Sequence, residues 1–304
     1  MEALDAALAR DIAANLADPS LRPRSLALLA ATQFDHGEIA LALASATRAI
    51  HENPTSRAAS RAALTWIAAA LKSDDAITLP PALSNTIRAY PELQRVCRDA
   101  IETGFPTIES AVARMQLTEV GAAHAPATSE LGVDARRVIL LASALQAATS
   151  TLAATLSAKN ALALLVSGAA ESAAICARDA FEHTREDRFV AWVAGEVLCA
   201  SSLAKDRAEG FAILRDLAPM GESARDAYWW RAQARLLEVL VREADSGDVR
   251  RASDVVARVN RLRTLDSEFG GDPTSQRIER VRDRAEALLK ANASSAKNGV
   301  SNGG

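Results

Sequence analysis

The sequence GEIALALASATRAIHENP at residues 37–54 shares its pattern with GAAESAAICARDAF at residues 168–181. Each stretch opens with glycine and then places alanine at the same intervals. The matching residues are Gly37, Ala42, Ala46 and Ala49 in the first stretch, and Gly168, Ala173, Ala177 and Ala180 in the second. Small residues at helical spacing are typical of helices that pack closely against one another. Repetition of such a unit predicts a stack of helical hairpins, which usually presents a surface to a partner.

The composition indicates a globular, helical chain. Of its 304 residues, 49% are hydrophobic and 24% charged, which is enough for a sizeable core. Alanine, the best helix former, is abundant, whereas runs rich in Val, Ile, Tyr and Thr are hard to find. The formal net charge of -3 gives no field that would gather nucleic acid or an acidic membrane surface. We therefore expect an all-α fold and neither of those partners.

The cysteines and the absence of an apolar span point to a reducing cytoplasm. Cys97, Cys176 and Cys199 are far apart, and each lies among apolar residues in a helix-like stretch, so we expect buried free thiols. None has the spacing of a zinc site. Acidic residues interrupt the first twenty or so positions, and no stretch approaches the roughly 20 apolar residues that a membrane span needs.

Apolar spacing and turn residues predict where the helices lie. Gly104-Phe105-Pro106 is expected to break the helical pattern, residues 72–81 to form a loop, and residues 121–132 to be the least ordered segment and a hinge. The expected helices cover residues 3–16, 25–34, 38–51, 56–71, a stretch opened by Pro91, residues 107–116, a stretch from Asp134, and residues 225–243, 249–265 and 279–289.

The spacing resembles that of a known family. The second helix of a tetratricopeptide repeat carries Gly, Ala, a small or aromatic residue, Ala and Pro in a unit of about 34 residues. Gly37, Ala42, Ala46, Ala49 and Pro54 resemble those positions. The resemblance implies a right-handed α-solenoid of antiparallel helical hairpins.

Residues of a second block also resemble this family, although the repeat spacing is not kept between the two blocks. Ala194, Gly195 and Leu198 are similar to the Leu, Gly and Tyr of the next unit, and Pro219 to its closing proline. Gly37 and Gly168 are not separated by a whole number of repeats, so an irregular middle is expected. The predicted organisation is a repeat block at residues 1–105, a connecting segment at 106–133, a second repeat block at 134–291 with a capping helix, and a disordered tail at 292–304.

Motifs of the common enzyme classes are missing from the sequence. The chain has no phosphate-binding GxxxxGK[ST], no GxGxxG after a strand, no HExxH and no GxSxG. The four histidines lie in turns, at helix ends or in the weak segment, without a paired nucleophile. No catalytic, cofactor or metal residue is therefore predicted, and the chain is not expected to be an enzyme.

One candidate binding site is aromatic. Tyr228, Trp229, Trp230 and Arg231 are consecutive, and Arg235 follows one turn later. Three successive rings cannot all face one direction on a helix, so at least one is expected to be partly exposed. An exposed Trp or Tyr beside Arg would anchor a peptide or a partner helix. The alternative is that the rings fill space left by the alanines.

The other candidate is the inner face of the hairpins, which tetratricopeptide arrays commonly build from their first helices. The family members that clamp a terminal carboxylate use Lys and Asn where this chain has Ala27 and Ala31, so that mode of binding is not expected. The candidates on this face are Arg24 and Phe34 in the early hairpin and Phe189, Trp192 and Glu196 in the later one.

The sequence thus favours a non-enzymatic scaffold or adaptor that binds a protein or peptide. Two alternatives remain. The chain could be a regulatory or structural helical subunit of a homo- or hetero-oligomer, associating through the helix at residues 228–235. It could also be an enzyme with a site between helices, formed by polar groups that converge only in the fold.

Overall fold

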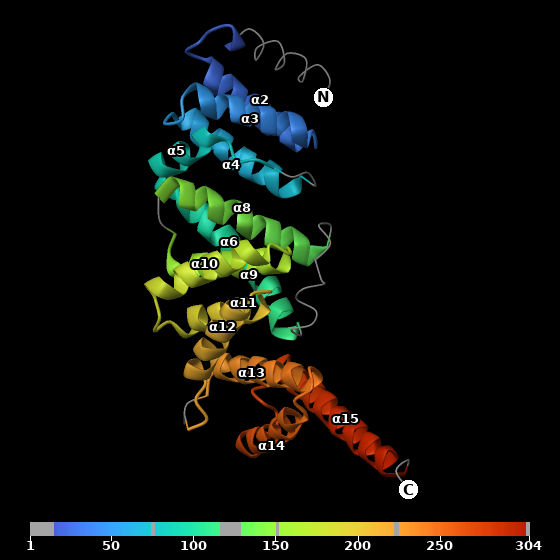
Figure 1. The fold of residues 1–304 in the computed structure, drawn as a ribbon. Helices are drawn as coiled ribbons and strands as arrows, with labels where there is room; N and C mark the ends of the chain where they lie inside the picture. The colour runs from blue at the N-terminus through green and yellow to red at the C-terminus, as the bar shows by residue number, and fades with distance from the viewer. Residues whose placement is uncertain (1–14, 74–76, 116–128, 150–151, 222–224, 302–304) are drawn as a thin grey trace. The chain divides into compact units, whose positions relative to one another are not determined.

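The computed structural model describes residues 15–73, 77–115, 129–149, 152–221 and 225–301 (Figure 1). Over these residues the chain forms thirteen α-helices and no strand, which confirms the all-α prediction. The helices are α2 (Arg22–Asp35), α3 (Ile39–Glu52), α4 (Arg57–Lys72), α5 (Pro81–Ala89), α6 (Pro91–Arg114), α8 (Glu130–Thr149), α9 (Ala154–Val166), α10 (Ala170–His183), α11 (Arg188–Ala200), α12 (Ala204–Leu217), α13 (Ala227–Asp245), α14 (Val249–Leu265) and α15 (Thr274–Ser301).

The chain folds into two compact units. The first contains Met1–Phe105 and Pro126–Leu152, and the second contains Pro106–Ala125 and Ala153–Gly304. Helix α6 therefore begins in the first unit and ends in the second, while α8 belongs to the first. Neighbouring helices pack against one another in chain order within each unit, as α2, α3 and α4 do in the first.

The repeated glycines form the turns of two hairpins. Gly37 lies between α2 and α3 with φ +79°, and Gly168 lies between α9 and α10 with φ +82°. In both turns the residue after the glycine donates its backbone N–H to the carbonyl oxygen five positions earlier, at 2.8 Å and 2.9 Å. Such a left-handed residue with its returning bond commonly ends a helix, and glycine adopts it without a steric cost. The glycines at matching positions of the two stretches therefore form the same type of turn.

The two hairpins continue into the following helix in the same register. Helices α3 and α10 both have 14 residues. The next helices are capped at equivalent positions: Ser56 Oγ accepts the backbone N–H of Ala59, and Asp187 Oδ1 accepts that of Val190, both at 3.1 Å. A capping side chain satisfies a helix N–H group that would otherwise lack a partner, and so fixes where the helix begins. Helices α4 and α11 can therefore be compared residue by residue.

The core of these hairpins is built from small side chains. Every alanine of the repeated pattern is buried, which lets the flanking helices approach closely. These buried alanines are Ala42, Ala46, Ala49, Ala173, Ala177 and Ala180. In the second unit, Gly210 of α12 lies against the backbone of α11, since a Cβ there would lie 2.7 Å from the Cys199 nitrogen and 2.9 Å from the Gly195 oxygen.

The expected helix break at Gly104-Phe105-Pro106 is wrong. Helix α6 is continuous from Pro91 to Arg114 and contains Pro106. Proline removes one backbone hydrogen bond from a helix interior. Ile101, Phe105 and Ile108 are nevertheless all buried, so the apolar stripe passes through the proline without interruption. Burial of this stripe outweighs the lost bond, and the expected helix at residues 107–116 is the end of α6.

Several other predictions can be placed. The helix expected at residues 3–16 lies almost wholly outside the described residues, as does most of the segment at 121–132. Helix α15 includes the expected capping helix and runs on to Ser301. The cysteines are free, with Cys97 and Cys199 buried and Cys176 half-buried. None of the described helices is long and apolar enough to cross a bilayer.

Candidate binding site

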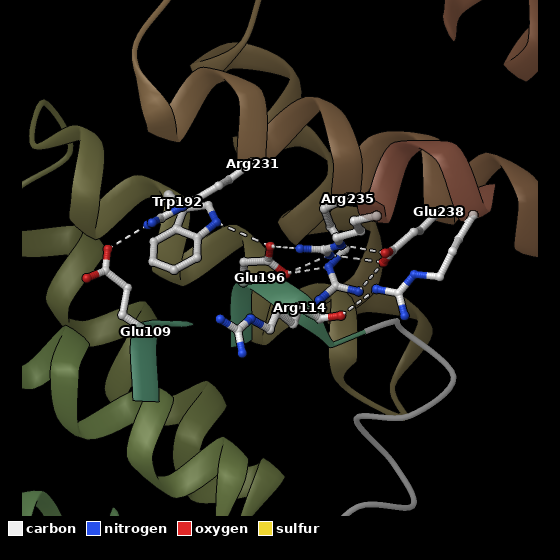
Figure 2. A network of polar contacts seen from close by, with 9 residues as sticks. Glu109, Arg114, Trp192, Glu196, Arg231, Arg235 and Glu238 are labelled. Carbon is white, nitrogen blue, oxygen red and sulfur yellow. Dashed lines mark hydrogen bonds and ion pairs between the residues drawn. The ribbon is translucent and has the colours of Figure 1, made fainter. Parts of the chain in front are cut away.

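Four charged side chains meet in the core of the second unit, where α11, α13 and α15 pack together (Figure 2). Glu196 comes from α11, Arg235 and Glu238 from α13, and Arg277 from α15. Arg235 and Glu238 are three positions apart, so they share one face of their helix. The exposed fraction is 0% for Glu196, Arg235 and Arg277 and 6% for Glu238. We call these four residues the buried charge network.

The network alternates carboxylates with guanidiniums. Arg235 donates to Glu196 and to Glu238. Arg277 donates from Nε to Glu238 at 2.5 Å and from Nη1 to Glu196 at 3.0 Å. The indole of Trp192 adds a donor to Glu196 at 3.2 Å (Figure 2). Two positive and two negative groups thus cancel, which is what a set of buried charges requires.

The electrostatics favour a structural role for this network. Burial alone would raise the pKa of Glu196, but the guanidiniums of Arg235 and Arg277 outweigh it and hold that pKa below its ordinary value. Burial by itself would lower the pKa of Arg277, whereas Glu196 and Glu238 raise it. A carboxylate with a lowered pKa is a weak base and holds no proton to donate at neutral pH. The network therefore joins three helices and is poorly suited to acid–base chemistry.

An aromatic cluster adjoins the network. Trp192 stacks on Tyr228 with 5.7 Å between ring centroids, and Phe189 lies 5.9 Å from Tyr228. Arg231 lies over the Trp192 ring at 4.8 Å and donates to Glu109 of α6 at 2.5 Å (Figure 2). The cation beside the aromatic rings is therefore already paired with a carboxylate of the same unit. Arg280 of α15 also donates to the Arg114 carbonyl at 2.9 Å, which holds the end of α6.

The structure places the predicted aromatic residues unequally. Trp229 is fully buried and donates from its indole to the Pro219 carbonyl at 3.1 Å. Trp230 is 5% exposed and packs edge-on against Phe269. Tyr228 is the half-buried member of the three, and burial raises its pKa. Neither tryptophan is available as a surface anchor, because the core of the unit encloses both rings.

The later inner-face candidates are likewise mostly interior. Trp192 and Glu196 are buried in the network just described, as is Arg235 from the aromatic candidate. Phe189 is half-buried at the edge of the aromatic cluster. Trp192 and Glu196 were expected to line an open groove, but side chains of α13 and α15 cover them. On this face only Phe189, at its margin, retains partial exposure among the predicted residues.

An open pocket lies in the first unit, between α2 and α4. Its volume is about 560 Å³, and its lining comes from both helices. Arg24 of the predicted inner face lines it, together with Ala27 and Ala31. The full lining is Arg24, Ala27, Leu28 and Ala31 from α2, and Arg57, Ala58, Arg61 and Thr65 from α4. We call this feature the α2–α4 pocket.

Three arginines dominate the polar part of this pocket. Arg57 and Arg61 are one turn apart on α4, and Arg24 lies on α2. All three are exposed, and within the described part of the chain none forms an ion pair with a carboxylate. Phe34, the other early candidate, lies outside the lining, and its ring packs 4.4 Å from the Lys72 ammonium. The pocket thus combines a small apolar floor with unpaired positive charge.

Sequence reasoning missed several residues of both features. Glu238 and Arg277 complete the buried charge network, while Arg57 and Arg61 form one wall of the pocket. The spacing of Arg57 and Arg61 in an alanine-rich helix was an available signal. Glu196 was a second signal. It is a carboxylate within the apolar stretch FVAWVAGEVLCA, so its burial would require positively charged partners from elsewhere in the chain.

Comparison with family models, with curated proteins and with solved structures found no match to this chain. Across the described residues, no three His, Cys, Asp or Glu side chains are grouped so that they could hold a metal ion.

Proposed function

We propose that this protein is a non-enzymatic, tetratricopeptide-like scaffold that binds a peptide segment of a protein partner in the α2–α4 pocket. The observation that carries the proposal is the pocket itself, which is open, about 560 Å³ in volume and lined by two helices of successive layers. Helical-repeat proteins use surfaces of this kind to hold partner segments.

The lining chemistry supports peptide binding. Ala27, Ala31 and Ala58 leave room close to the helix backbones, so an extended chain can approach both walls. Leu28 adds an apolar side chain that is 48% exposed. Mostly apolar lining with a few polar groups is the usual composition of a ligand site. The buried charge network, by contrast, is enclosed and its two carboxylates are paired with its own two guanidiniums, which favours a structural role for these four residues.

The pocket can be tested by filling it. Ala58 is half-buried in the lining, and the equivalent position of α11 is Phe189. An Ala58→Phe substitution should therefore fit the helix and occupy the pocket. Random peptides would be selected from a display library against the full chain, and their affinities measured for the wild type and the variant. We expect Ala58→Phe to weaken the selected peptides at least about tenfold, which corresponds to a loss of about 1.4 kcal/mol.

A matched control separates blocking from unfolding. Ala44 is exposed on α3 of the same unit and lies outside the lining, so Ala44→Phe adds the same ring elsewhere. This variant should bind the selected peptides as the wild type does, and both variants should keep their melting temperatures within about 2 °C. Selected peptides that bind Ala58→Phe and the wild type equally would show that the pocket is not the binding site.

A further inference from the structure

We infer that the α2–α4 pocket recognises an acidic peptide segment, whose carboxylates are held by Arg57 and Arg61, with Arg24 adding a further positive charge. This inference rests on the proposed peptide binding and adds the chemistry of the partner. The pocket then selects peptides that contain glutamate or aspartate. Neither the composition nor the repeat pattern of the chain indicates this preference.

Charge complementarity is the first argument. The lining carries three positive side chains and no carboxylate, although the whole chain has a net charge of -3. Two arginines of the second unit offer a contrast: Arg188 is paired with Asp226 at 2.7 Å, and Arg178 with Asp206 at 3.0 Å. Grouped and unpaired cations create a local positive potential that attracts an anionic partner.

The type and spacing of the cations are the second argument. A guanidinium binds a carboxylate through two parallel hydrogen bonds, which makes arginine well suited to this group. Arg57 and Arg61 are four positions apart on α4, and residues at this spacing on a helix generally have Cβ atoms about 6 Å apart. Alternate side chains of an extended peptide are about 6.6 Å apart on one face. A Glu-x-Glu sequence therefore matches the two arginines of α4.

The opposite wall suits the intervening residues. In an extended peptide, the side chains between the two glutamates point the other way. In the pocket that direction leads to α2, where Leu28 and Ala31 offer apolar contact. Arg24, one turn from Leu28 on the same helix, adds a third positive charge to the lining. The preferred partner is thus a peptide in which acidic and apolar residues alternate.

A nucleic acid fits the pocket less well. Proteins that bind single strands combine basic grooves with aromatic side chains on which the bases stack. The lining contains no aromatic residue, and three arginines are few for a polyanion whose binding scales with the number of phosphates neutralised. Apolar contact from Leu28 is better used by a peptide side chain.

The test uses the full chain and a defined probe. A fluorescein-labelled peptide of alternating glutamate and leucine is titrated with protein at low salt, and its anisotropy is measured. We expect the Arg57→Gln/Arg61→Gln double variant to weaken this peptide at least about tenfold. The control is Arg95→Gln/Arg98→Gln, which removes two exposed charges from α6 in the same unit, outside the pocket, and should change the affinity less than about twofold.

Two further arms test the chemistry. The same peptide with glutamine in place of glutamate should bind at least about tenfold more weakly. Raising the salt concentration should weaken the glutamate peptide and leave the glutamine peptide nearly unchanged, because salt screens exposed charges. A single-stranded oligonucleotide of similar length should bind more weakly than the glutamate peptide.

The outcomes separate this inference from the proposed function. If Ala58→Phe blocks the library peptides, but the glutamine peptide binds as tightly as the glutamate peptide, the pocket binds peptides and the acidic inference is wrong. Full affinity of Arg57→Gln/Arg61→Gln, undetectable binding of the glutamate peptide, or tighter binding of the oligonucleotide would overturn it equally. If Ala58→Phe leaves the binding of the glutamate peptide unchanged, that peptide binds outside the pocket and the acidic inference is wrong. The proposed peptide binding fails only if Ala58→Phe also leaves the affinities of the library-selected peptides unchanged.

Discussion

Helices α4 and α11 occupy the same place in their hairpins, yet they present opposite kinds of surface. Both follow a 14-residue helix, and both begin with a side-chain cap. The face of α4 that borders the pocket carries Arg57, Ala58, Arg61 and Thr65, whereas the equivalent positions of α11 carry Arg188, Phe189, Trp192 and Glu196.

In the second unit, residues of that same unit pair with or cover the side chains on this face of α11. Asp226 forms an ion pair with Arg188, and the guanidinium of Arg231 lies over the Trp192 ring. From α15, Arg277 forms an ion pair with Glu196. The first unit leaves the equivalent face of α4 open, with its arginines unpaired among the described residues. The same hairpin frame can therefore close into core or remain available to a partner. Which of these happens depends on whether later helices of the same unit pack over it.

Removing one arginine from each region tests this difference between the units. Arg277→Met leaves Glu196 and Glu238 buried with one guanidinium between them, and we expect a loss of about 3–5 kcal/mol in unfolding free energy. Arg57→Met makes the same change on an exposed face and should cost little. Urea denaturation followed by tryptophan fluorescence checks this, since three of the four tryptophans lie in the second unit. A loss below about 1 kcal/mol for Arg277→Met would contradict the buried state of the network.

Acid should weaken the same network. The pKa of Glu196 is lowered in the folded state, so its stabilisation is complete above the ordinary glutamate pKa of about 4.3. That stabilisation is lost as the pH falls through the lowered folded pKa. We expect unfolding free energy to drop steeply in this range, and to drop less steeply in Glu196→Gln, which cannot titrate. Equal slopes for the two proteins in pH-dependent denaturation would show that Glu196 does not supply the effect.

The close contact of α11 with α12 is a second distinction between the units. A Cβ at Gly210 would lie 2.7 Å and 2.9 Å from backbone atoms of α11, which cannot turn aside. Gly210→Ala should therefore cost about 1–3 kcal/mol. The control is Gly221→Ala, where nothing lies within 4 Å of the added atom. Thermal denaturation of both variants decides the point, and equal melting temperatures would mean that the two helices separate without cost.

The pair of Arg231 and Glu109 should contribute less than the buried network. Its side chains are 17% and 25% exposed, and Arg231 also lies over the Trp192 ring. A double-mutant cycle with Arg231→Gln and Glu109→Gln should give a coupling energy of about 1 kcal/mol. A coupling near zero would indicate that solvent already screens the pair. The cycle thereby measures how firmly the end of α6 is held in the second unit.

The smallest effect on stability is expected where binding is most affected. Arg57→Gln/Arg61→Gln removes exposed, unpaired charges, so the melting temperature should stay within about 2 °C of the wild type. Calorimetry of the free proteins checks this. A marked decrease would mean that these arginines support the fold of the first unit. A marked increase in the melting temperature would show that repulsion between the two arginines destabilises the wild-type fold.

Local features of the fold could be predicted from the sequence, because they depend on nearby residues. Gly37 and Gly168 mark helix ends through their own backbone freedom, and apolar spacing finds the helices between such ends. The error at Pro106 has the opposite origin. Proline is a local signal against a helix, and it was outweighed by burial of the neighbouring apolar side chains. A residue's local preference against helix is overcome where burial of side chains in the tertiary structure stabilises the helix by more.

The sites were harder to predict, because they join distant residues. Glu196 and Arg277 are 81 positions apart, and no periodicity along the chain reports which faces of α11 and α15 meet. Trp192 and Glu196 were expected on an open groove because the pattern of α11 describes its own faces only. What covers a face is decided by other helices. Arg57 and Arg61 could be found from the pattern of α4, but not that, among the described residues, this face lines an open pocket.

The interleaved order of the two units bears on how the protein is made. The first unit needs residues beyond 126, since α8 packs on α5 and the Ala148 carbonyl accepts a bond from Arg88 at 2.7 Å. The end of α6, which belongs to the second unit, is translated before α8. A chain emerging from the ribosome must therefore hold that segment, Glu109 included, without its eventual neighbours until α11 and α13 appear. Folding during synthesis cannot finish one unit before the other has begun.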